Sequence, residues 1–169
     1  MDMIRRIEAI EKGKRFDEQH DENGNIIFYV KEDGKKVWLK YADDNDIYYK
    51  TNTGVSYRYH FDNNDNIVYR VSDSCEEWYD KFGNITYHYD FTIDYKEWRE
   101  YDADGNLIYL KDCSGLEIWY RDGRVILRKE SNGTKKWYGY DQNGKLIRTK
   151  DSAGYEEWYG YDQNGSDQD

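Results

Sequence analysis

Proline is absent from all 169 residues, so no position in the chain lacks a backbone N–H for a β-ladder. Long hydrophobic runs are also missing, and no segment approaches the roughly 18 apolar residues of a membrane span. Residues 1–13 contain no apolar stretch of the kind found in a secretory signal. Cysteine occurs only at Cys75 and Cys113, which is too little for a disulfide framework. These absences predict a cytoplasmic protein with reduced thiols and no contact with a membrane.

The charge balance is acidic, with 35 acidic and 25 basic residues and a formal net charge of −10. Such a chain is not expected to bind nucleic acid directly, and a protein partner with a basic surface is favoured instead. The same charge is also compatible with a role in solubility alone. Hydrophobic residues make up only 37% of the chain, but it holds 19 Tyr, 6 Trp and 5 Phe. Disordered segments are poor in aromatic residues, so the composition predicts a folded chain with a thin core.

An internal repeat is the strongest feature of the sequence. Six tryptophans recur at related places, and Asp17 and Arg58 occupy the two places in the same register that lack one. Successive register positions are 18 to 21 residues apart along nearly the whole chain. A regular period of this length is typical of arrays in which each repeat is one supersecondary unit. The tryptophans are Trp38, Trp78, Trp98, Trp119, Trp137 and Trp158.

Each repeat carries two turn signals. In the unit at residues 140–160, Asp141–Gly144 is one turn and Asp151–Gly154 is the other. Asn-Gly and Asp-Gly pairs supply the positive φ that tight hairpins need, and the runs between them are rich in strand-forming residues. The pattern therefore predicts an all-β fold, a twisted antiparallel meander of about 14–16 strands. We expect residues 14–165 to form eight β-hairpin repeats and residues 166–169 to form a short tail.

Alternation along the strands predicts which residues face the core. In the first strand of most units, an aliphatic residue and the residue two places later share one parity, as in Ile26/Phe28 and Ile47/Tyr49. The tryptophans of the second strands have charged neighbours, as in Lys36-Trp38-Lys40, which indicates the other face. We therefore expect one buried column, formed by Ile26, Ile47, Ile67, Ile85, Leu107, Val125 and Leu146.

The N-terminus differs from the repeats. Met3, Ile4, Ile7 and Ile10 fall on one helical stripe, with Asp2 as N-cap and Gly13 after the last turn. Residues 1–13 are therefore expected to hold a short amphipathic helix, at residues 2–12, which caps the apolar end of the array. A helix that binds a partner is the alternative.

The repeat resembles the YD (RHS-type) repeat of bacterial proteins, in which Tyr-Asp and a Gly three residues later precede an apolar strand. Tyr101-Asp102 with Gly105, and Tyr140-Asp141 with Gly144, match this pattern. Tyr161-Asp162 with Gly165 is a third match, Phe61-Asp62 and His20-Asp21 are weaker ones, and Tyr41-Ala42 departs from the pattern. The resemblance implies a β-repeat fold over residues 16–165. In the family such repeats form a shell around a toxin or a surface scaffold, whereas this short array resembles in style the small proteins of bacterial and phage conflict systems.

Catalytic and metal-binding patterns do not stand out. His20, His60 and His88 have no metal-ligand spacing with Cys or another His. Asp102, Asp104 and Asn106 alternate as calcium ligands do, but Asx side chains also stabilise turns, and we favour that interpretation. A catalytic site needs one asymmetric set of residues, whereas this chain repeats the same residues. The sequence therefore predicts a non-enzymatic protein without metal or cofactor.

Two binding surfaces remain as hypotheses, beside a passive scaffold. The first is an acidic edge of turn residues that could block a basic, nucleic-acid-binding surface of a partner such as a nuclease or CRISPR effector, as an immunity or anti-defence protein would. It comprises Asp21, Glu22, Asp43, Asp44, Asp62, Asp65, Asp102, Asp104, Asp141 and Asp162. The second is the row of six tryptophans, which could stack on carbohydrate or simply cover the sheet.

Overall fold

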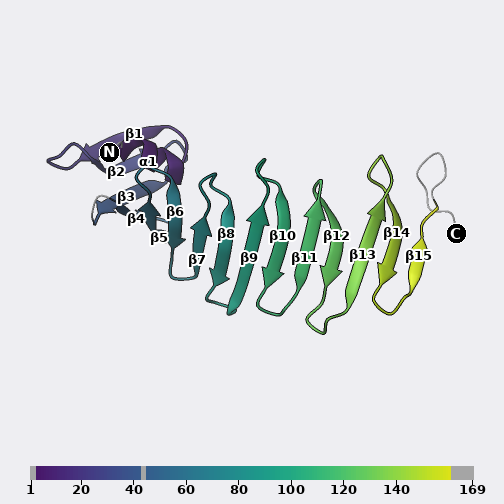
Figure 1. Cartoon of the computed structure of the whole chain (residues 1–169). Helices are drawn as coiled ribbons and strands as arrows, with labels where there is room; N and C mark the ends of the chain where they lie inside the picture. The colour runs from purple at the N-terminus through teal and green to yellow at the C-terminus, as the bar shows by residue number, and fades with distance from the viewer. Residues whose placement is uncertain (1–2, 43–44, 161–169) are drawn as a thin grey trace. The chain divides into compact units, whose positions relative to one another are not determined.

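Within the described part of the chain, fifteen β-strands form one sheet whose order follows the sequence, together with one N-terminal helix (Figure 1). The computed structural model describes residues 3–42 and 45–160. The predicted all-β meander is therefore confirmed. The elements are α1 (Met3–Ile10), β1 (Arg15–His20), β2 (Ile26–Lys31), β3 (Lys36–Tyr41), β4 (Asp46–Thr51), β5 (Ser56–Phe61), β6 (Ile67–Val71), β7 (Cys75–Tyr79), β8 (Ile85–Asp90), β9 (Tyr95–Tyr101), β10 (Leu107–Asp112), β11 (Glu117–Arg121), β12 (Arg124–Lys129), β13 (Lys135–Tyr140), β14 (Leu146–Asp151) and β15 (Glu156–Trp158).

Two compact units divide the chain, unit 1 at residues 1–95 and unit 2 at residues 96–169. Unit 1 holds α1 and β1–β8, and unit 2 holds β10–β15 with all of β9 except its first residue. The repeat period gives no sign of this boundary, because the register continues from Trp78 to Trp98 without a break.

The turns form as the Asp-x-x-Gly pattern predicts. In the β1–β2 turn, Asp21 Oδ1 accepts hydrogen bonds from the backbone N–H groups of Asn23 and Asn25, both at 2.9 Å. Gly24 takes φ of 81°, in the left-handed region that favours glycine. Asp102 makes the same pair of bonds to Asp104 and Asn106 in the β9–β10 turn. The side chain thus replaces backbone partners that the tight turn leaves unpaired.

A β-bulge after most of these turns changes which face the next strand presents. In β6, Ile67 pairs with Phe61 but Tyr69 pairs with His60, so the register shifts between them. Similar shifts occur in β2, β8, β10, β12 and β14, whereas β4 has none. A bulge places one extra residue on one strand, so residues two apart no longer share a face. The predicted pairing of Ile26 with Phe28 on one face is therefore wrong, while that of Ile47 with Tyr49 holds.

The hydrophobic core of the described residues lies in unit 1, between α1 and one face of its strands. Ile7 of α1 packs there, and Ile10 lies half-buried against the same cluster. The strand residues of this core are Ile26, Tyr29, Val37, Leu39, Ile47, Tyr49, Tyr59 and Phe61. Ile26 and Ile47 are thus buried as expected, and Ile67 lies half-buried against them.

The helix covers a sheet face instead of the end of the array where we expected it. Arg6 forms an ion pair with Asp65 at 2.6 Å, and its guanidinium carbon lies 5.0 Å from the ring centre of Phe61. Both partners come from β5 and the turn after it, whereas β1 forms the end of the sheet. Of the predicted helical stripe, Ile7 is buried and Ile10 is half-buried, whereas Ile4 is exposed. Asp2, the expected N-cap, lies outside the described residues.

Unit 2 has no comparable core. Among its described residues, 96–160, every element is a strand of one sheet and no hydrophobic side chain is fully buried. The predicted burial of Leu107, Val125 and Leu146 is therefore wrong, and all three are half-buried, as is Ile85 in unit 1. With no second layer in this part of the chain, side chains are covered only by neighbours across the strands.

Candidate functional site

Within each unit the described tryptophans lie on one face of the sheet, which in unit 1 is the face opposite the helix, and most of them are exposed. In β3, Val37 and Leu39 are buried under α1, and Trp38 between them is 42% exposed. Successive side chains of a strand point to opposite faces, so Trp38 lies on the uncovered face. Trp78, Trp98, Trp137 and Trp158 are exposed as well, whereas Trp119 is half-buried. We call this surface the tryptophan face.

In unit 1, each described tryptophan of this face packs beside another ring. Phe28 and Trp38 are register partners, with ring centres 5.5 Å apart. Tyr69 and Trp78 lie closer, at 4.7 Å. Offset and tilted ring pairs stabilise each other beyond the area they bury. Neighbouring rings therefore fix the orientation of the exposed indoles.

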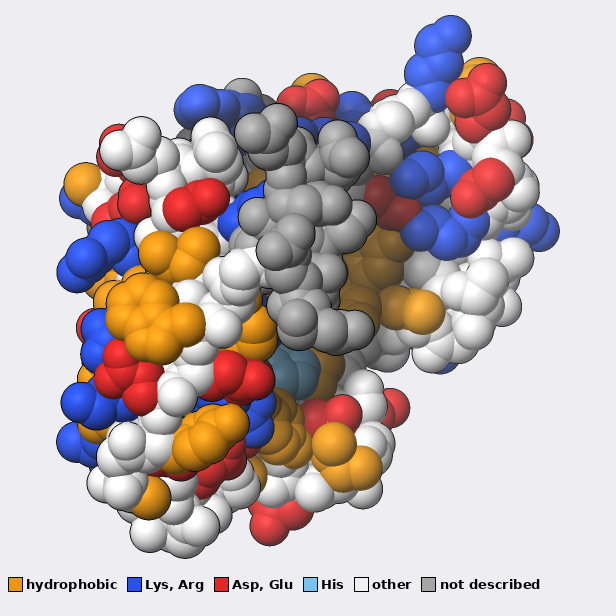
Figure 2. All heavy atoms as spheres, turned by 90° about the vertical axis from the view of Figure 1, so that its right-hand side faces the viewer, with side chains coloured by type: hydrophobic (Ala, Val, Ile, Leu, Met, Phe, Trp, Pro, Cys, Tyr) orange, Lys and Arg blue, Asp and Glu red, His pale blue; other side chains and the backbone are white. Residues whose placement is uncertain are grey.

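In unit 2, the tryptophan face carries a continuous apolar row across four adjacent strands. Tyr109 of β10 pairs with Trp119 of β11, which pairs with Leu127 of β12, which pairs with Trp137 of β13. The row ends at Glu100 on one side and Lys150 on the other. Figure 2, seen from the β15 side of Figure 1, shows hydrophobic side chains lying among charged ones. We call the residues from Tyr109 to Trp137 the aromatic row.

Charged side chains beside the aromatic row form hydrogen bonds and ion pairs with one another and with its tyrosine. Glu117 accepts hydrogen bonds from Lys129 Nζ at 2.7 Å and from the Tyr109 hydroxyl at 3.1 Å. The bond from Lys129 lowers the pKa of Glu117, so this carboxylate stays ionised. Near the end of the unit, the guanidinium carbon of Arg148 lies 5.2 Å from the ring centre of Trp158. Trp and Tyr are among the residues enriched at the centres of protein interfaces, so the aromatic row is a candidate binding surface.

The acidic turn residues of each unit lie at the same end of the strands, because every second hairpin of a meander turns there. We call this end of the sheet the turn edge. Unit 1 places Asp21, Glu22, Asp62 and Asp65 at this edge, and unit 2 places Asp102, Asp104 and Asp141 there. Asp43, Asp44 and Asp162 lie outside the described residues. Asp80 occupies the equivalent place between β7 and β8 and was missed, although Asp80-Lys81-Phe82-Gly83 carries the same turn signal.

Most of these carboxylates belong to the turns themselves. Hydrogen bonds from Asn25 lower the pKa of Asp21, and bonds from Asn106 lower that of Asp102. Such side chains remain ionised, but they are fixed in place by the turn. Asp65 is committed to Arg6, whereas Glu22 and Asp104 are exposed. The edge therefore carries fixed negative charge with few mobile carboxylates.

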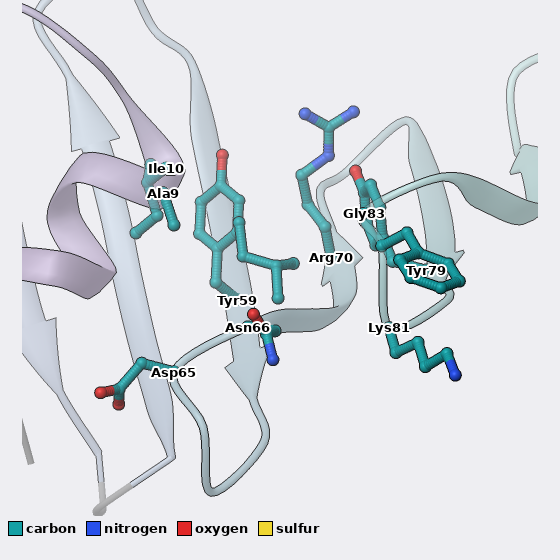
Figure 3. A pocket seen from close by; sticks show the side chains of 11 residues that line it. Ala9, Ile10, Tyr59, Asp65, Asn66, Arg70, Tyr79, Lys81 and Gly83 are labelled. Atoms are coloured by element: carbon teal, nitrogen blue, oxygen red, sulfur yellow. The ribbon is translucent and has the colours of Figure 1, made fainter. Parts of the chain in front are cut away.

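A cavity of about 330 Å³ lies on the helix side of unit 1 (Figure 3). Ala9 and Ile10 of α1 line one side of it, and Arg70 lies between Tyr59 and Tyr79. Arg70 forms an ion pair with the buried Glu77, which also accepts a hydrogen bond from the Tyr79 hydroxyl. The charged groups that line this cavity are thus largely paired with groups of the chain itself.

Metal ligands and membrane spans were searched for in the described part of the chain. No three His, Cys, Asp or Glu side chains there are grouped so that they could hold a metal ion. The only described helix, α1, has neither the length nor the apolar composition to cross a bilayer.

Comparisons with known proteins identify no family. No protein-family model and no curated protein matches the chain. Among solved structures, the crystal structure of TcdB2-TccC3 aligns with 94% of this chain at 13% identity and a TM-score of 0.40. That of TcdB2-TccC3-TEV aligns with 94% at 14% identity and a TM-score of 0.37. The chain spans 12% and 11% of those chains, and a likeness of this extent carries no inference about function.

Proposed function

We propose that the chain is a non-enzymatic repeat module that binds another protein through the tryptophan face. The observation that carries this proposal is the aromatic row of unit 2, Tyr109–Trp119–Leu127–Trp137 across four strands. Trp, Tyr and Arg are the residues most enriched at the energetic centres of protein interfaces. Soluble proteins seldom leave a contiguous apolar surface open unless it contacts a partner.

Leu127 favours a protein partner over a carbohydrate. It stands between Trp119 and Trp137, one strand spacing of about 4.8 Å from each. A sugar ring stacks on an isolated aromatic platform that has hydrogen-bonding groups around it. A row of alternating indole and aliphatic side chains is instead suited to the apolar core of a protein interface.

The turn edge supports a finer proposal about the partner. Ionised carboxylates fixed by their own turns, together with the net charge of −10, would steer a basic surface towards the sheet. If that basic surface binds nucleic acid, occupying it would inhibit the partner without chemistry. We therefore propose an inhibitor of the immunity or anti-defence type, acting on a nuclease or a CRISPR effector in the cytoplasm.

Affinity capture with matched variants tests the main proposal. The double change of Trp119 and Trp137 to Ser removes both indoles of the aromatic row. Tyr155→Ser is the control, because Tyr155 is 65% exposed but lies in the β14–β15 turn outside the row. We expect the double variant to lose at least roughly 30-fold in affinity for a partner that the control still binds. Equal capture by both variants would remove the aromatic row as the binding surface.

The finer proposal is tested on the captured partner by association kinetics at two salt concentrations. Changing Asp102, Asp104 and Asp141 together to Asn removes three charges while keeping side chains that can still stabilise a turn. We expect a slower on-rate at low salt and a smaller difference at high salt. An on-rate that does not change at low salt would show that the edge does not steer the partner.

A further inference from the structure

Unit 1 carries three exposed lysines around one exposed indole on the tryptophan face. Lys36 and Lys40 flank Trp38 on β3, two residues away on either side, and Lys50 of β4 is its register partner. Tyr48 of β4 pairs with Lys40 and is 41% exposed. We call these five residues the lysine–tryptophan patch. The patch is positively charged, whereas the net charge of the whole chain is −10.

The lysines of this patch have no acidic partner among the described residues. Asp46, a neighbouring acid on the same face, is almost fully buried and is held by Arg58 at 2.7 Å and by His60 at 3.1 Å. Its charge is therefore already compensated. By contrast, Lys31 and Lys35, on the helix side, are both paired with Glu11.

The patch is also hollowed. Trp38, Lys40, Tyr48, Lys50 and Ser56 line a depression of about 560 Å³. Residues four apart on a strand are separated by about 13 Å, so the stems of Lys36 and Lys40 stand that far apart with the indole midway between them. An extended peptide has the same repeat along its own length. Its side chains at i, i+2 and i+4 would meet the first lysine, the indole and the second lysine in turn.

We propose that the lysine–tryptophan patch binds an extended, acidic segment of a partner protein, with carboxylates at i and i+4 and an apolar side chain at i+2. The carboxylates would pair with Lys36 and Lys40, and the apolar side chain would pack on Trp38. Lys50 would face a third carboxylate or the C-terminal one.

Charge complementarity favours a short acidic segment over a nucleic acid. Three lysines match two or three carboxylates, whereas nucleic-acid binding without sequence specificity draws on many phosphate contacts. The turn that leads into β3 is also acidic, with Asp33, and would repel a polyanion that continued beyond the patch in that direction. This surface lies in unit 1 and is independent of the aromatic row of unit 2, so the two proposals stand or fall separately.

The test is an NMR titration of the full chain at low salt. The probe is a synthetic peptide with the order Glu-Ser-Phe-Ser-Glu, and the control peptide has the same composition with the two Glu adjacent. Two protein variants are compared, Lys36, Lys40 and Lys50 changed together to Gln, and Lys12, Lys14 and Lys81 changed together to Gln. All six lysines are exposed, so both variants are expected to fold like the wild type.

The expected result is a shift of the Trp38 indole N–H with the first peptide and at least 10-fold weaker binding by the patch variant. The control variant should retain wild-type affinity, and the control peptide should bind more weakly. Equal affinity of the two lysine variants would overturn the proposal, as would the absence of any shift at Trp38. A short oligothymidylate titrated in parallel gives the remaining outcome. If it binds Trp38 more tightly than the peptide does, the patch is a nucleic-acid site and the proposal is wrong.

Discussion

Glu11, just beyond the last residue of α1, fixes the helix to the sheet of unit 1, and its removal gives a sharp test of how this unit is stabilised. Its carboxylate accepts hydrogen bonds from Lys31 Nζ at 2.9 Å and from the Tyr49 hydroxyl at 2.7 Å. Lys35 and the Tyr29 hydroxyl bind it as well. Only 14% of the side chain is exposed, so these contacts are poorly screened by solvent.

The magnitude follows from the pKa of Glu11. Burial acts to raise this pKa, but the hydrogen bonds from Lys35, Tyr49 and Lys31 outweigh burial and lower it from 4.5 to about 2. Because the folded pKa is depressed, the ionised carboxylate stabilises the fold above the unfolded pKa. This stability is lost as the pH falls from about 4.5 towards 2. The difference corresponds to roughly 3 kcal/mol at neutral pH, of which about 2 kcal/mol is lost by pH 3.

Glu11→Gln keeps the shape of the side chain and removes its charge. We expect it to cost roughly 3 kcal/mol in the free energy of unfolding at pH 7 and only about 1 kcal/mol at pH 3. Urea unfolding followed by circular dichroism at both values measures this. Glu8→Gln is the control, because Glu8 is an exposed acid of the same helix. If Glu11→Gln and the wild type lost equal stability between pH 7 and pH 3, the reasoning would be refuted.

Two further perturbations test the packing and the turns. Ile47→Ala should cost about 2–5 kcal/mol because Ile47 is 1% exposed, whereas Leu107→Ala in the single-layer unit 2 should cost less than half as much; equal shifts of the urea midpoint would contradict the core described here. Gly54→Ala should cost about 1 kcal/mol because Gly54 takes φ of 88°, and Gly160→Ala, at a glycine outside the left-handed region, should leave the melting temperature unchanged. Equal melting temperatures for both glycine variants would argue against the left-handed turn.

The strands and turns can be predicted from local sequence patterns, whereas the residues of the hydrophobic core cannot. Asp21–Gly24 and its counterparts determine their own turns through side-chain bonds within five residues, so their sequence pattern is sufficient. The bulge between Ile67 and Tyr69 arises instead from how two strands pair across the turn. One extra residue inverts the faces of everything that follows it, and a parity argument cannot detect this. Strand β4 has no bulge, and there the same argument succeeds.

For the candidate surfaces, too, the sequence predicts local features but not contacts between distant residues. The exposure of Trp38 follows from its charged neighbours, because Lys36 and Lys40 must share its face. The pairing of Asp65 with Arg6 joins residues 59 positions apart, and no local pattern contains it. The face that α1 covers is likewise a matter of tertiary packing. Sequence reasoning therefore identified the exposed tryptophans and the acidic turns as candidate surfaces but overestimated how many of the acidic side chains are free of partners within the chain.

The most direct test of the central claim, that most indoles are exposed on the tryptophan face of each unit, is ¹⁹F NMR of the chain labelled with 5-fluorotryptophan. Each of the six resonances, assigned with single Trp→Phe variants, reports its own solvent exposure through the shift between H₂O and D₂O. The structure predicts the largest solvent shifts at Trp158 and Trp78, which are 66% and 50% exposed, and the smallest at Trp119. Uniformly small solvent shifts at all six tryptophans would show that the indoles are buried and would contradict the account.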